Sequence, residues 1–388
     1  MSTPRQVALL IEATNAYARG LLRGVARYTH ERVRWTVYFE PHALDEPPPR
    51  WLSGWKGDGI LARIGSRRMA KAVLAAGVPV VELRRIHSIA GVPCIGPDNQ
   101  EVTRLGLEHL RERGFHQFGF CGFPRGLDPP MDGRAHAFLR HAQAAGLPCS
   151  LFPAERNSNW AQEQSRLVRW VRSLPKPAGI MTCNDGRGLQ VLRACFQARI
   201  PVPDQVAVLG AGNDDCLCGL AHPPLSSIDL APELIGYEAA ALLDRLMAGA
   251  RSASRPLLMA PRGIVTRLST DVLATQDQTV AKAVALIRER ACDGLRVGEV
   301  LRHVGLSRTA LEPRLKRVLG RTVHQEISHV RIEHAKTLLS TTDLPTKQIA
   351  GRTGFRHVQY LTRVFHKATG QTPALYRRRT LNPAPVGP

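Results

Sequence analysis

Residues 297–322 read VGEVLRHVGLSRTALEPRLKRVLGRT, and residues 346–372 read TKQIAGRTGFRHVQYLTRVFHKATGQT. Both segments follow one plan: a short helical stretch, a glycine for a tight turn (Gly305 or Gly354), and an arginine-rich amphipathic helix. Glycine suits that turn because it reaches backbone conformations that other residues rarely adopt. The plan is that of a helix-turn-helix, whose second helix enters the major groove of DNA. Two copies in tandem predict a protein that reads an extended stretch of double-stranded DNA.

The repeat continues beyond the two glycines, which lie 49 positions apart. From there the copies match at an offset of 50, pairing Leu311 with Leu361, Leu315 with Phe365, Gly320 with Gly370 and Thr322 with Thr372. The apolar residues of the second copy recur at helical spacing, so we expect them to form a small core. They are Ile349, Ala350, Phe355, Leu361 and Phe365. In the first copy, Ser307 is the expected N-cap of the second helix.

Length and charge narrow the possible classes of protein. A chain of 388 residues has room for two or three domains with buried cores. Its formal charge of +21 is uneven, since residues 281–380 hold 20 Lys and Arg against 7 Asp and Glu. A basic C-terminal region favours a polyanionic partner such as DNA; the competing interpretation is that arginine simply coats the surface.

The sequence contains no apolar run of about 18 residues, so we expect no membrane span. Its N-terminus lacks the layout of a signal peptide. The eight cysteines include no C-x-x-C pair, and Cys216 and Cys218 stand too close for ordinary zinc spacing. We therefore expect a cytoplasmic protein with reduced thiols, no metal site and no cofactor.

Short apolar runs alternate with helical patterns from residue 6 to about 268. Candidate strands occupy residues 6–11, 35–39, 59–62, 79–83, 94–95, 115–121, 179–183 and 206–209. Candidate helices occupy residues 16–28, 67–76, 99–112, 134–145, 160–173, 187–198 and 232–248. This alternation predicts parallel sheets covered on both faces. We predict a two-lobed α/β sensor domain at residues 1–268, a linker at 269–279, and an all-α domain with two helix-turn-helix units at 280–388.

The alternation of strands and helices begins again near Phe115, which suggests where the first lobe ends. We expect the first lobe at about 5–121 plus 229–255, and the second at about 122–228 plus a final strand near 261–268. The chain would then cross between the lobes three times, near Gly122, Asp229 and Met259. Ligands of open α/β sheets bind beyond the carboxyl ends of the strands, so side chains that follow strands are candidate contacts.

The C-terminal region resembles the arabinose-activator (AraC) type of DNA-binding domain. The segment IAGRTGFRHVQYLTRVFHKATGQTPALYRR carries the resemblance, with its glycine–aromatic turn and its T-P-x-x-Y-R close. Side chains near the start of each second helix are the candidate DNA contacts: Arg308, Thr309 and Glu312, then Arg356, His357, Gln359, Thr362 and Arg363. The resemblance places Thr309, Glu312, Gln359, Thr362 and Arg363 where family members contact bases, and Arg and Gln can bond bidentately to base edges.

Each of these side chains could instead be an ordinary solvated surface residue. Pro313 lies about six positions into the first reading helix, where proline removes a backbone donor and tends to kink a helix. Members of the family that this region resembles often have a polar or basic side chain there. We therefore expect the first unit to bind weakly or to position the protein, while the second unit selects the DNA sequence.

The N-terminal region resembles the two-lobed sugar-binding core of lactose-repressor (LacI) type regulators, which shares its fold with periplasmic binding proteins. The matching stretches are PDNQEVTRLGLEHLRERGF, DGRAHAFLR, GIMTCNDGRGLQVLRACFQARIPVPDQVAVLGAGNDD and PPLSSIDLAPELIGYEAAALLDRL. In those regulators a DNA headpiece precedes the core, whereas here the DNA-reading units follow it. A sensor core followed by DNA-reading units is the order found in the xylose operon regulators. The chain resembles those regulators over nearly its full length.

A pyranose offers hydroxyl groups and weakly apolar ring faces. A sugar pocket therefore needs carboxylates, amides and a guanidinium for the hydroxyls and an aromatic ring that stacks on a face. The candidate ligand contacts are Glu12, Asp98, Arg134, Trp160, Asn184, Asp185, Asn213 and Asp214. The competing interpretations are that these side chains cap helices or form a salt bridge between the lobes. For Trp160 the competing interpretation is a half-buried hydrophobic residue at the start of a helix. Glu12 stands where the xylose regulators have asparagine, and Gly212 stands where related proteins often carry aspartate.

Taken together, these motifs predict a ligand-controlled transcription regulator. The resemblance implies an effector such as D-xylose or a related pentose, a homodimer, and recruitment of RNA polymerase as an activator. An enzyme is the rival class, but the sequence shows no P-loop, no G-x-S-x-G and no H-E-x-x-H. Two further classes stay open: a sugar-binding protein without a DNA function, and a regulator of the same architecture that responds to a non-sugar metabolite or to no ligand.

Overall fold

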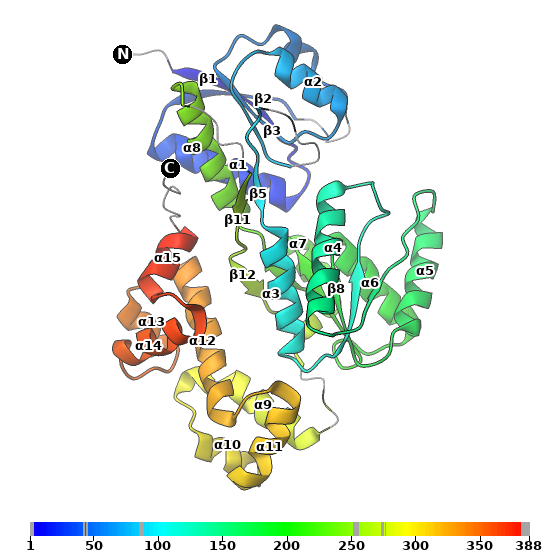
Figure 1. Cartoon of the computed structure of the whole chain (residues 1–388), viewed down its shortest axis with the longest axis vertical. Coiled ribbons are helices and arrows are strands. Elements are labelled where there is room, and N and C mark those ends of the chain that lie inside the picture. Colours follow the sequence, from blue (N-terminus) through cyan, green and yellow to red (C-terminus); the bar gives the residue numbers. More distant parts are fainter. Residues whose placement is uncertain are drawn as a thin grey trace.

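The structure, a computed structural model, describes residues 4–41, 43, 46–84, 89, 91–250, 256–272, 275 and 277–381. Figure 1 shows two α/β lobes and, below them, a group of helices formed by the C-terminal part of the chain. The predicted fold class is confirmed: a two-lobed sensor of mainly parallel sheets is followed by an all-helical domain.

The first lobe is built on a four-stranded parallel sheet with the order β2-β1-β3-β4. Its strands are β1 (Arg5–Leu10), β2 (Trp35–Phe39), β3 (Gly59–Ala62) and β4 (Val80–Glu82). Its helices are α1 (Ala16–Glu31), α2 (Arg67–Ala75) and α8 (Pro232–Met247). Alternate residues of β1 enter different cores, Val7 and Leu9 on one face and Ala8 and Leu10 on the other. The sheet is therefore apolar on both faces, as the uninterrupted apolar run predicts.

Helices α1 and α8 cross in close contact although about 200 residues separate them in the sequence (Figure 1). A Cβ on Gly24 would lie 2.0 Å from the carbonyl oxygen of Glu233, and a Cβ on Gly236 would lie 2.0 Å from that of Leu21. Both positions therefore require glycine, because the two backbones approach too closely for any side chain.

The second lobe is built on a six-stranded sheet with the order β12-β10-β9-β8-β6-β7. Its strands are β6 (Gln117–Cys121), β7 (Cys149–Leu151), β8 (Ala178–Thr182), β9 (Val206–Ala211), β10 (Ser226–Asp229) and β12 (Gly263–Val265). The pairs are parallel except that β12 runs antiparallel to β10. Its helices are α3 (Asn99–Arg111), α4 (Pro129–Ala144), α5 (Trp160–Ser173), α6 (Asp185–Ala198) and α7 (Asp215–Leu220).

A separate two-stranded sheet joins the lobes, formed by β5 (Ile95–Pro97) and β11 (Leu257–Met259). The predicted crossings near Asp229 and Met259 agree with the structure, because β10 and β12 belong to the second sheet and α8 belongs to the first lobe. The crossing predicted near Gly122 is wrong. Strand β6 already belongs to the second sheet, so the chain crosses after β5, about 25 residues earlier. The restart near Phe115 marks a strand inside the second lobe.

The short strands β7, β10 and β11 and the short helix α7 were not predicted. Strand β10 reads Ser-Ser-Ile-Asp, and β7 and β11 have three residues each, so none of them shows a long apolar run. Helix α4 also begins five residues before its predicted start, because Asp128 caps it and Pro129 occupies its first turn. Arg134 therefore lies in the second turn of α4 and does not open the helix.

The C-terminal domain contains α9 (Gln278–Arg290), α10 (Val297–Val304), α11 (Arg308–Leu319), α12 (Val323–Thr341), α13 (Thr346–Arg352), α14 (Val358–Thr369) and α15 (Pro373–Leu381). Helices α10 and α11 form the first helix-turn-helix, and α13 and α14 form the second. Gly305 and Gly354 lie in the left-handed region at φ 66° and 72°, which explains the glycine at each turn. Helix α12 connects the units, and Arg331 on it donates to the carbonyl oxygens of Ala291 and Leu295.

Each helix-turn-helix unit has its own core. The five apolar residues predicted for the second unit are buried together with Ile332, Ala335 and Leu339 of α12. Ser307 caps α11, since its hydroxyl accepts from the amide of Ala310. Helix α11 runs without interruption through Pro313. Of the helices in the described part of the chain, none is long and apolar enough to cross a membrane.

Candidate ligand pocket and nucleic-acid interface

A cavity of about 650 Å³ lies between the two lobes. Its walls come from the loops that follow β1, β3 and β4 in the first lobe and β6, β8 and β9 in the second. This is the carboxyl edge of both sheets, where parallel α/β sheets place their ligands. Six of the eight residues predicted to contact a ligand line it: Glu12, Asp98, Arg134, Asn184, Asp185 and Asp214.

Five helices begin at this cavity, and the capping residue of each lines it. The caps are Asn15 of α1, Asp98 of α3, Asp128 of α4, Asn184 of α6 and Asp214 of α7. Each side chain accepts from an amide of its own helix, so capping and lining the pocket are compatible roles. The positive ends of five helix dipoles therefore face the cavity, an arrangement that favours electronegative ligand atoms.

Asp185 is buried at the base of the second lobe's wall and organises its neighbours. Its carboxylate accepts from the Ser227 hydroxyl at 2.5 Å and from the Asp214 backbone amide at 2.8 Å. Burial raises the pKa of Asp185, and the two hydrogen bonds oppose that shift. Since a Cβ at Gly212 would lie only 2.9 Å from Asp185 Oδ2, the absence of a side chain at Gly212 makes room for this carboxylate.

Arg134 is buried, and it reaches the cavity from α4. Its Nε donates to Asn99 Oδ1 at 3.0 Å, and its Nη1 donates to the carbonyl oxygen of Cys183 at 2.5 Å. Burial lowers the pKa of the Arg134 guanidinium. Both hydrogen bonds fix the plane of the group, so its orientation in the cavity is preset.

In the first lobe, Glu12 pairs with Arg63, and the Arg63 guanidinium lies 5.4 Å from the centre of the Tyr17 ring. Burial, followed by the charge of Arg84, lowers the pKa of Arg63 to about 10. Within the described residues, Glu12 Oε2, Tyr17 Oη and Arg63 Nε are buried without a hydrogen-bond partner. The three side chains line one wall of the pocket and bring a carboxylate, a hydroxyl and a guanidinium together there.

Trp160 does not line the cavity, and its prediction as the stacking face for a sugar is wrong. It is the first residue of α5, its side chain is 56% exposed, and Arg193 lies 4.7 Å above its ring. The Asn159 cap begins α5 on the outer side of the lobe, away from the pocket. The aromatic side chains at the cavity are Tyr17 and Phe123.

Asn213 also does not line the cavity, which contradicts its prediction as a ligand contact. Its backbone is left-handed at φ 51°, and its side-chain oxygen accepts from Arg267 at 3.0 Å. The turn after β9 therefore directs Asn213 away from the pocket and Asp214 toward it. An alternation of this kind depends on one backbone angle, which the sequence does not reveal.

The cavity-lining residues that sequence reasoning missed include Asn15, Tyr17, Arg63, Arg84 and Phe123. Arg63 and Arg84 directly follow the predicted strands at 59–62 and 79–83, so the rule that selected Glu12 and Asp98 also applied to them. Phe123 stands two residues after the predicted strand at 115–121. Arg187 lies 5.0 Å from its ring centre and supports it from behind.

The candidate DNA contacts of the first unit lie on α11. Arg308 and Thr309 are exposed, and the Arg308 guanidinium pairs with Glu312 at 2.8 Å. The Thr309 hydroxyl lies 2.9 Å from that of Ser307. Arg308 and Thr309, both predicted to lie near DNA, thus have partners within their own unit.

The candidate contacts of the second unit lie just before α14 and in its first half. Arg356, His357, Gln359 and Arg363 are exposed, and Thr362 is partly buried. The Arg363 guanidinium lies 5.2 Å from the Tyr360 ring centre. This edge of α14 thus presents several hydrogen-bonding side chains over the core formed by Leu361 and Phe365.

A two-lobed pocket joined to tandem helix-turn-helix units defines a ligand-responsive, DNA-binding transcription regulator. The chain is 31% identical over 380 residues to the xylose operon regulatory protein of Haemophilus influenzae, covering 96% of this chain and 98% of that protein. It is 30% identical over 383 residues to the xylose operon regulatory protein of Escherichia coli, covering 96% of each. The chain belongs to the family of xylose operon regulators.

Models of three domain families match in the same order. Residues 6–90 match the XylR N-terminal domain, 107–270 the periplasmic binding protein-like domain, and 300–379 a helix-turn-helix domain. The solved structure of the xylose-binding transcription activator XylR is similar over 97% of this chain and 98% of that one, with a TM-score of 0.62 and 30% identity. These relatives are transcription regulators and not enzymes. In the described parts of the chain, no group of three or more His, Cys, Asp or Glu is placed to hold a metal ion.

Proposed function

We propose that the chain activates genes for the use of xylose or a related pentose, and that the sugar binds between the two lobes. The observation that carries the proposal is the polar lining of the cavity in the first lobe, where Glu12 supplies a carboxylate, Tyr17 a hydroxyl and Arg63 a guanidinium. A sugar hydroxyl both donates and accepts, so it can bond to all three. The rings of Tyr17 and Phe123 offer apolar surface for the sugar faces.

The names of the relatives support the choice of sugar. The relatives from Haemophilus influenzae and Escherichia coli are named xylose operon regulatory proteins, and the similar solved structure is described as a xylose-binding activator. Those properties belong to those proteins, and we extend them to this chain because the similarity covers both domains. The proposal includes a related pentose because Glu12, expected to stand where the xylose regulators have asparagine, changes the set of groups that meet the sugar hydroxyls.

A ligand changes the balance between two arrangements only by binding one of them more tightly. Side chains from both lobes line the cavity, so a ligand that touches both favours their closed arrangement. Closure turns the second lobe about the hinge strands β5 and β11 and moves the DNA-binding helices with it. We propose that the reoriented units bind neighbouring half-sites and recruit RNA polymerase. The DNA target makes the cytoplasm the place of action.

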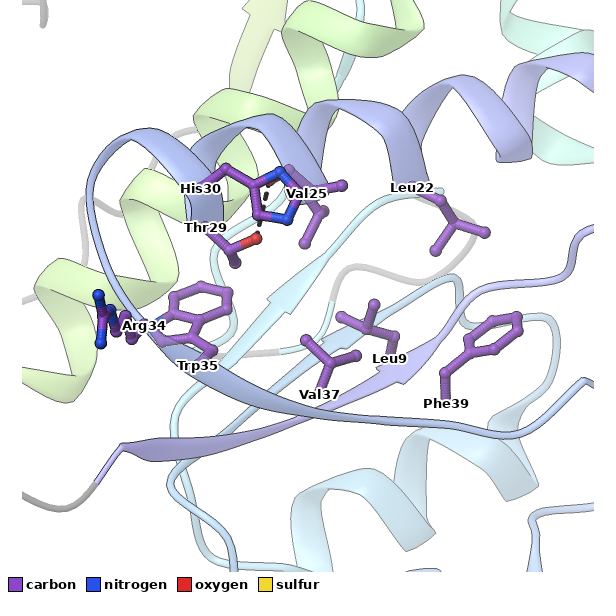
Figure 2. Close-up of a pocket in the computed structure, with 10 residues that line it drawn as sticks. Leu9, Leu22, Val25, Thr29, His30, Arg34, Trp35, Val37 and Phe39 are labelled. Carbon is purple, nitrogen blue, oxygen red and sulfur yellow. Dashed lines mark hydrogen bonds between the residues drawn. The ribbon is translucent and has the colours of Figure 1, made fainter.

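We propose a homodimer that forms along strand β2. This strand is at the edge of its sheet, and it exposes Val37, Tyr38 and Phe39 by 43%, 42% and 39%. Figure 2 shows Val37 and Phe39 facing a groove shared with Leu9, Leu22 and Val25. An exposed apolar edge strand is a natural pairing surface. Light scattering should show dimers for the wild type and for Leu74→Lys, but monomers for the double variant Val37→Lys, Phe39→Lys.

The ligand is tested by thermal unfolding of the purified chain against pentoses and hexoses. A ligand at one hundred times its dissociation constant adds about 2.7 kcal/mol of stability, which shifts the midpoint clearly. The variant Asp98→Asn separates recognition from folding, because Asn caps α3 as well as Asp does. We expect Asp98→Asn to keep its stability and lose sugar affinity. A flat response of the wild type to every sugar would instead favour a non-sugar metabolite or no ligand.

The DNA function is tested by salt titration of binding to a duplex that the full chain selects from random sequence. Neutralising about six phosphates makes affinity fall by orders of magnitude as salt rises. Arg363→Ala should lower affinity for that duplex by roughly 5- to 150-fold, because a bidentate base contact contributes about 1–3 kcal/mol. Arg308→Ala should lower the affinity for the duplex less, because Glu312 already pairs with the Arg308 guanidinium. Equal losses for both would contradict the dominance of the second unit.

A further inference from the structure

Helix α3 has one end in the pocket and the other end against the DNA-binding domain. Asp98, Asn99 and Gln100 at its start line the cavity, and Glu112 ends it. Its 13 residues span about 20 Å at the rise of an α-helix. Figure 1 shows α3 descending from the hinge strands toward α9 and α12. The helix is therefore a rigid connection between the two functional parts of the molecule.

The start of α3 is anchored in the pocket and at the hinge. The backbone amide of Asp98 donates to the carbonyl oxygen of Met259 at 2.8 Å, on hinge strand β11. Asn99 accepts from Arg134 Nε at 3.0 Å and donates to the carbonyl oxygen of Pro130 at 2.9 Å. A ligand that engages Arg134 or Asp98 therefore acts directly on the first turn of α3.

The end of α3 holds the DNA-binding domain by a charged contact. Glu112 Oε1 accepts from Arg321 Nη2 at 2.8 Å, and Glu112 Oε2 accepts from His329 Nε2 at 3.0 Å. Both partners belong to the DNA-binding domain, Arg321 just before α12 and His329 within it. Burial raises the pKa of Glu112, but the hydrogen bond and charge of His329 and the charges of Arg321 and Arg113 outweigh it, so the pKa falls to about 2.

The contacts around Glu112 are mainly polar. Arg113 donates to the carbonyl oxygen of Thr270 at 2.7 Å, and Arg288 on α9 donates to that of Val272 at 2.9 Å. Arg321 also pairs with Glu326 on α12 at 3.0 Å. Polar contacts of this kind exchange readily with water, whereas an apolar core between the domains would lock them together. The contact between the DNA-binding domain and the second lobe can therefore form and break readily.

We propose that Glu112 is the positioning residue that docks the DNA-binding domain on the second lobe, and that α3 transmits the state of the pocket through it. The inference rests on the proposed function, because it needs a ligand in the pocket to act on α3. Glu112 does not line the cavity, and it lies on α3 and not on α11 or α14. It acts by fixing the angle at which α12, and with it both helix-turn-helix units, leaves the sensor.

The first experiment measures coupling in the full chain with Glu112→Gln and, as the matched control, Glu108→Gln. Glu108 lies one turn earlier on α3 and pairs with Arg104 on the same helix. The readout is the ratio of affinities for the selected duplex with and without D-xylose; allosteric ratios are typically about 5- to 150-fold. We expect the control to keep the wild-type ratio and Glu112→Gln to bring it toward one, with the midpoint of sugar-free unfolding little changed. A wild-type ratio in Glu112→Gln overturns the proposal.

A second experiment does not depend on the sugar. Glu112→Arg places like charges beside Arg321, so small-angle X-ray scattering should show a larger maximum dimension than for the wild type or Glu108→Arg. Restoring the pair with Arg321→Glu should return the compact profile. If no pentose changes the DNA affinity of the wild type, the proposed effector is wrong. The scattering experiment still decides whether Glu112 docks the DNA-binding domain. An unchanged profile for Glu112→Arg overturns the docking role.

Discussion

Arg84 and Asp128 form an ion pair across the pocket: Arg84 Nη2 donates to Asp128 Oδ2 at 2.8 Å. Arg84 follows β4 in the first lobe, and Asp128 caps α4 in the second. Both side chains line the cavity and are mostly shielded from water, with exposures of 13% and 16%. The pair is thus a direct link between the lobes that is independent of the hinge strands.

Breaking this link should weaken ligand binding. In Arg84→Met the closed arrangement loses an interlobe contact, so the ligand must supply more of the closing free energy. We expect the dissociation constant to rise roughly 5- to 30-fold, or about 1–2 kcal/mol, by isothermal titration calorimetry. Arg23→Met is the control, because Arg23 pairs with Glu233 inside the first lobe. An unchanged dissociation constant for Arg84→Met would show that the pair does not take part in closure.

The aromatic face of the pocket should be Phe123 and not Trp160. Phe123 lines the cavity with Arg187 behind it, whereas Trp160 is exposed on the outer side of the second lobe. We expect Phe123→Ala to weaken sugar binding roughly tenfold, which is about 1.4 kcal/mol. Trp160→Ala should leave it unchanged. Calorimetry on the two variants, each checked for folding by circular dichroism, would contradict this assignment if Trp160→Ala lost more affinity.

The two turn glycines should differ in their tolerance of alanine. At Gly305 a Cβ would meet no atom of the described residues within 4 Å, so alanine adds only left-handed strain of roughly 1–2 kcal/mol. At Gly354 a Cβ would also lie 2.8 Å from the carbonyl oxygens of Ala291 and Cys292. Gly354→Ala should therefore cost more stability than Gly305→Ala in urea unfolding. Equal losses would mean that the backbone near Ala291 moves away at little cost.

Stability should fall in mild acid because of His109. Burial, and then the charges of Arg113 and Arg288, lower its pKa well below 6.5. The Thr270 hydroxyl donates to Ser226, so the Nε2–H of His109 donates to the Thr270 oxygen. Because its pKa is lowered, the His109 ring is neutral near pH 7. The unfolded chain takes up a proton near pH 6.5 that the folded state resists. The contribution of His109 is therefore complete above pH 6.5 and is lost as the pH falls below it.

The expected slope from one such proton is at most about 1.4 kcal/mol per pH unit. Urea unfolding between pH 7.5 and 5 should show a shallower slope for His109→Gln than for the wild type. His116→Gln should match the wild type, because His116 is exposed. A wild-type slope in His109→Gln would assign the acid sensitivity to other groups.

Much of the architecture followed from patterns of residues near one another in the chain. The tandem glycines with their apolar repeats predicted both helix-turn-helix units, and Ile349, Leu361 and Phe365 form the predicted core. The β-branched runs predicted the long strands of both sheets. These signals are local, because helical and strand periodicities arise within about ten residues.

The lobe boundary and the pocket walls could not be predicted in the same way. Strand β6 looks like the strands of the first lobe but pairs with β8, and only the pairing assigns it to the second sheet. The rule that candidate contacts follow strands selected Glu12, Asp98 and Asp185, which line the cavity, but it also selected Asn213, which does not. A turn with φ 51° sends that side chain to Arg267.

The sequence by itself determined most of the longer helices and strands, that two DNA-reading units follow a two-lobed sensor, and that polar side chains gather at the ends of strands. Only the tertiary structure decided that Arg84 meets Asp128 across the pocket and that Glu112 meets Arg321 and His329. The physical reason is the distance along the chain between the residues that interact. Periodicity and capping depend on neighbours in the chain, whereas an ion pair between residues 209 positions apart forms only after the packing of α3 and α12 has brought the charges together.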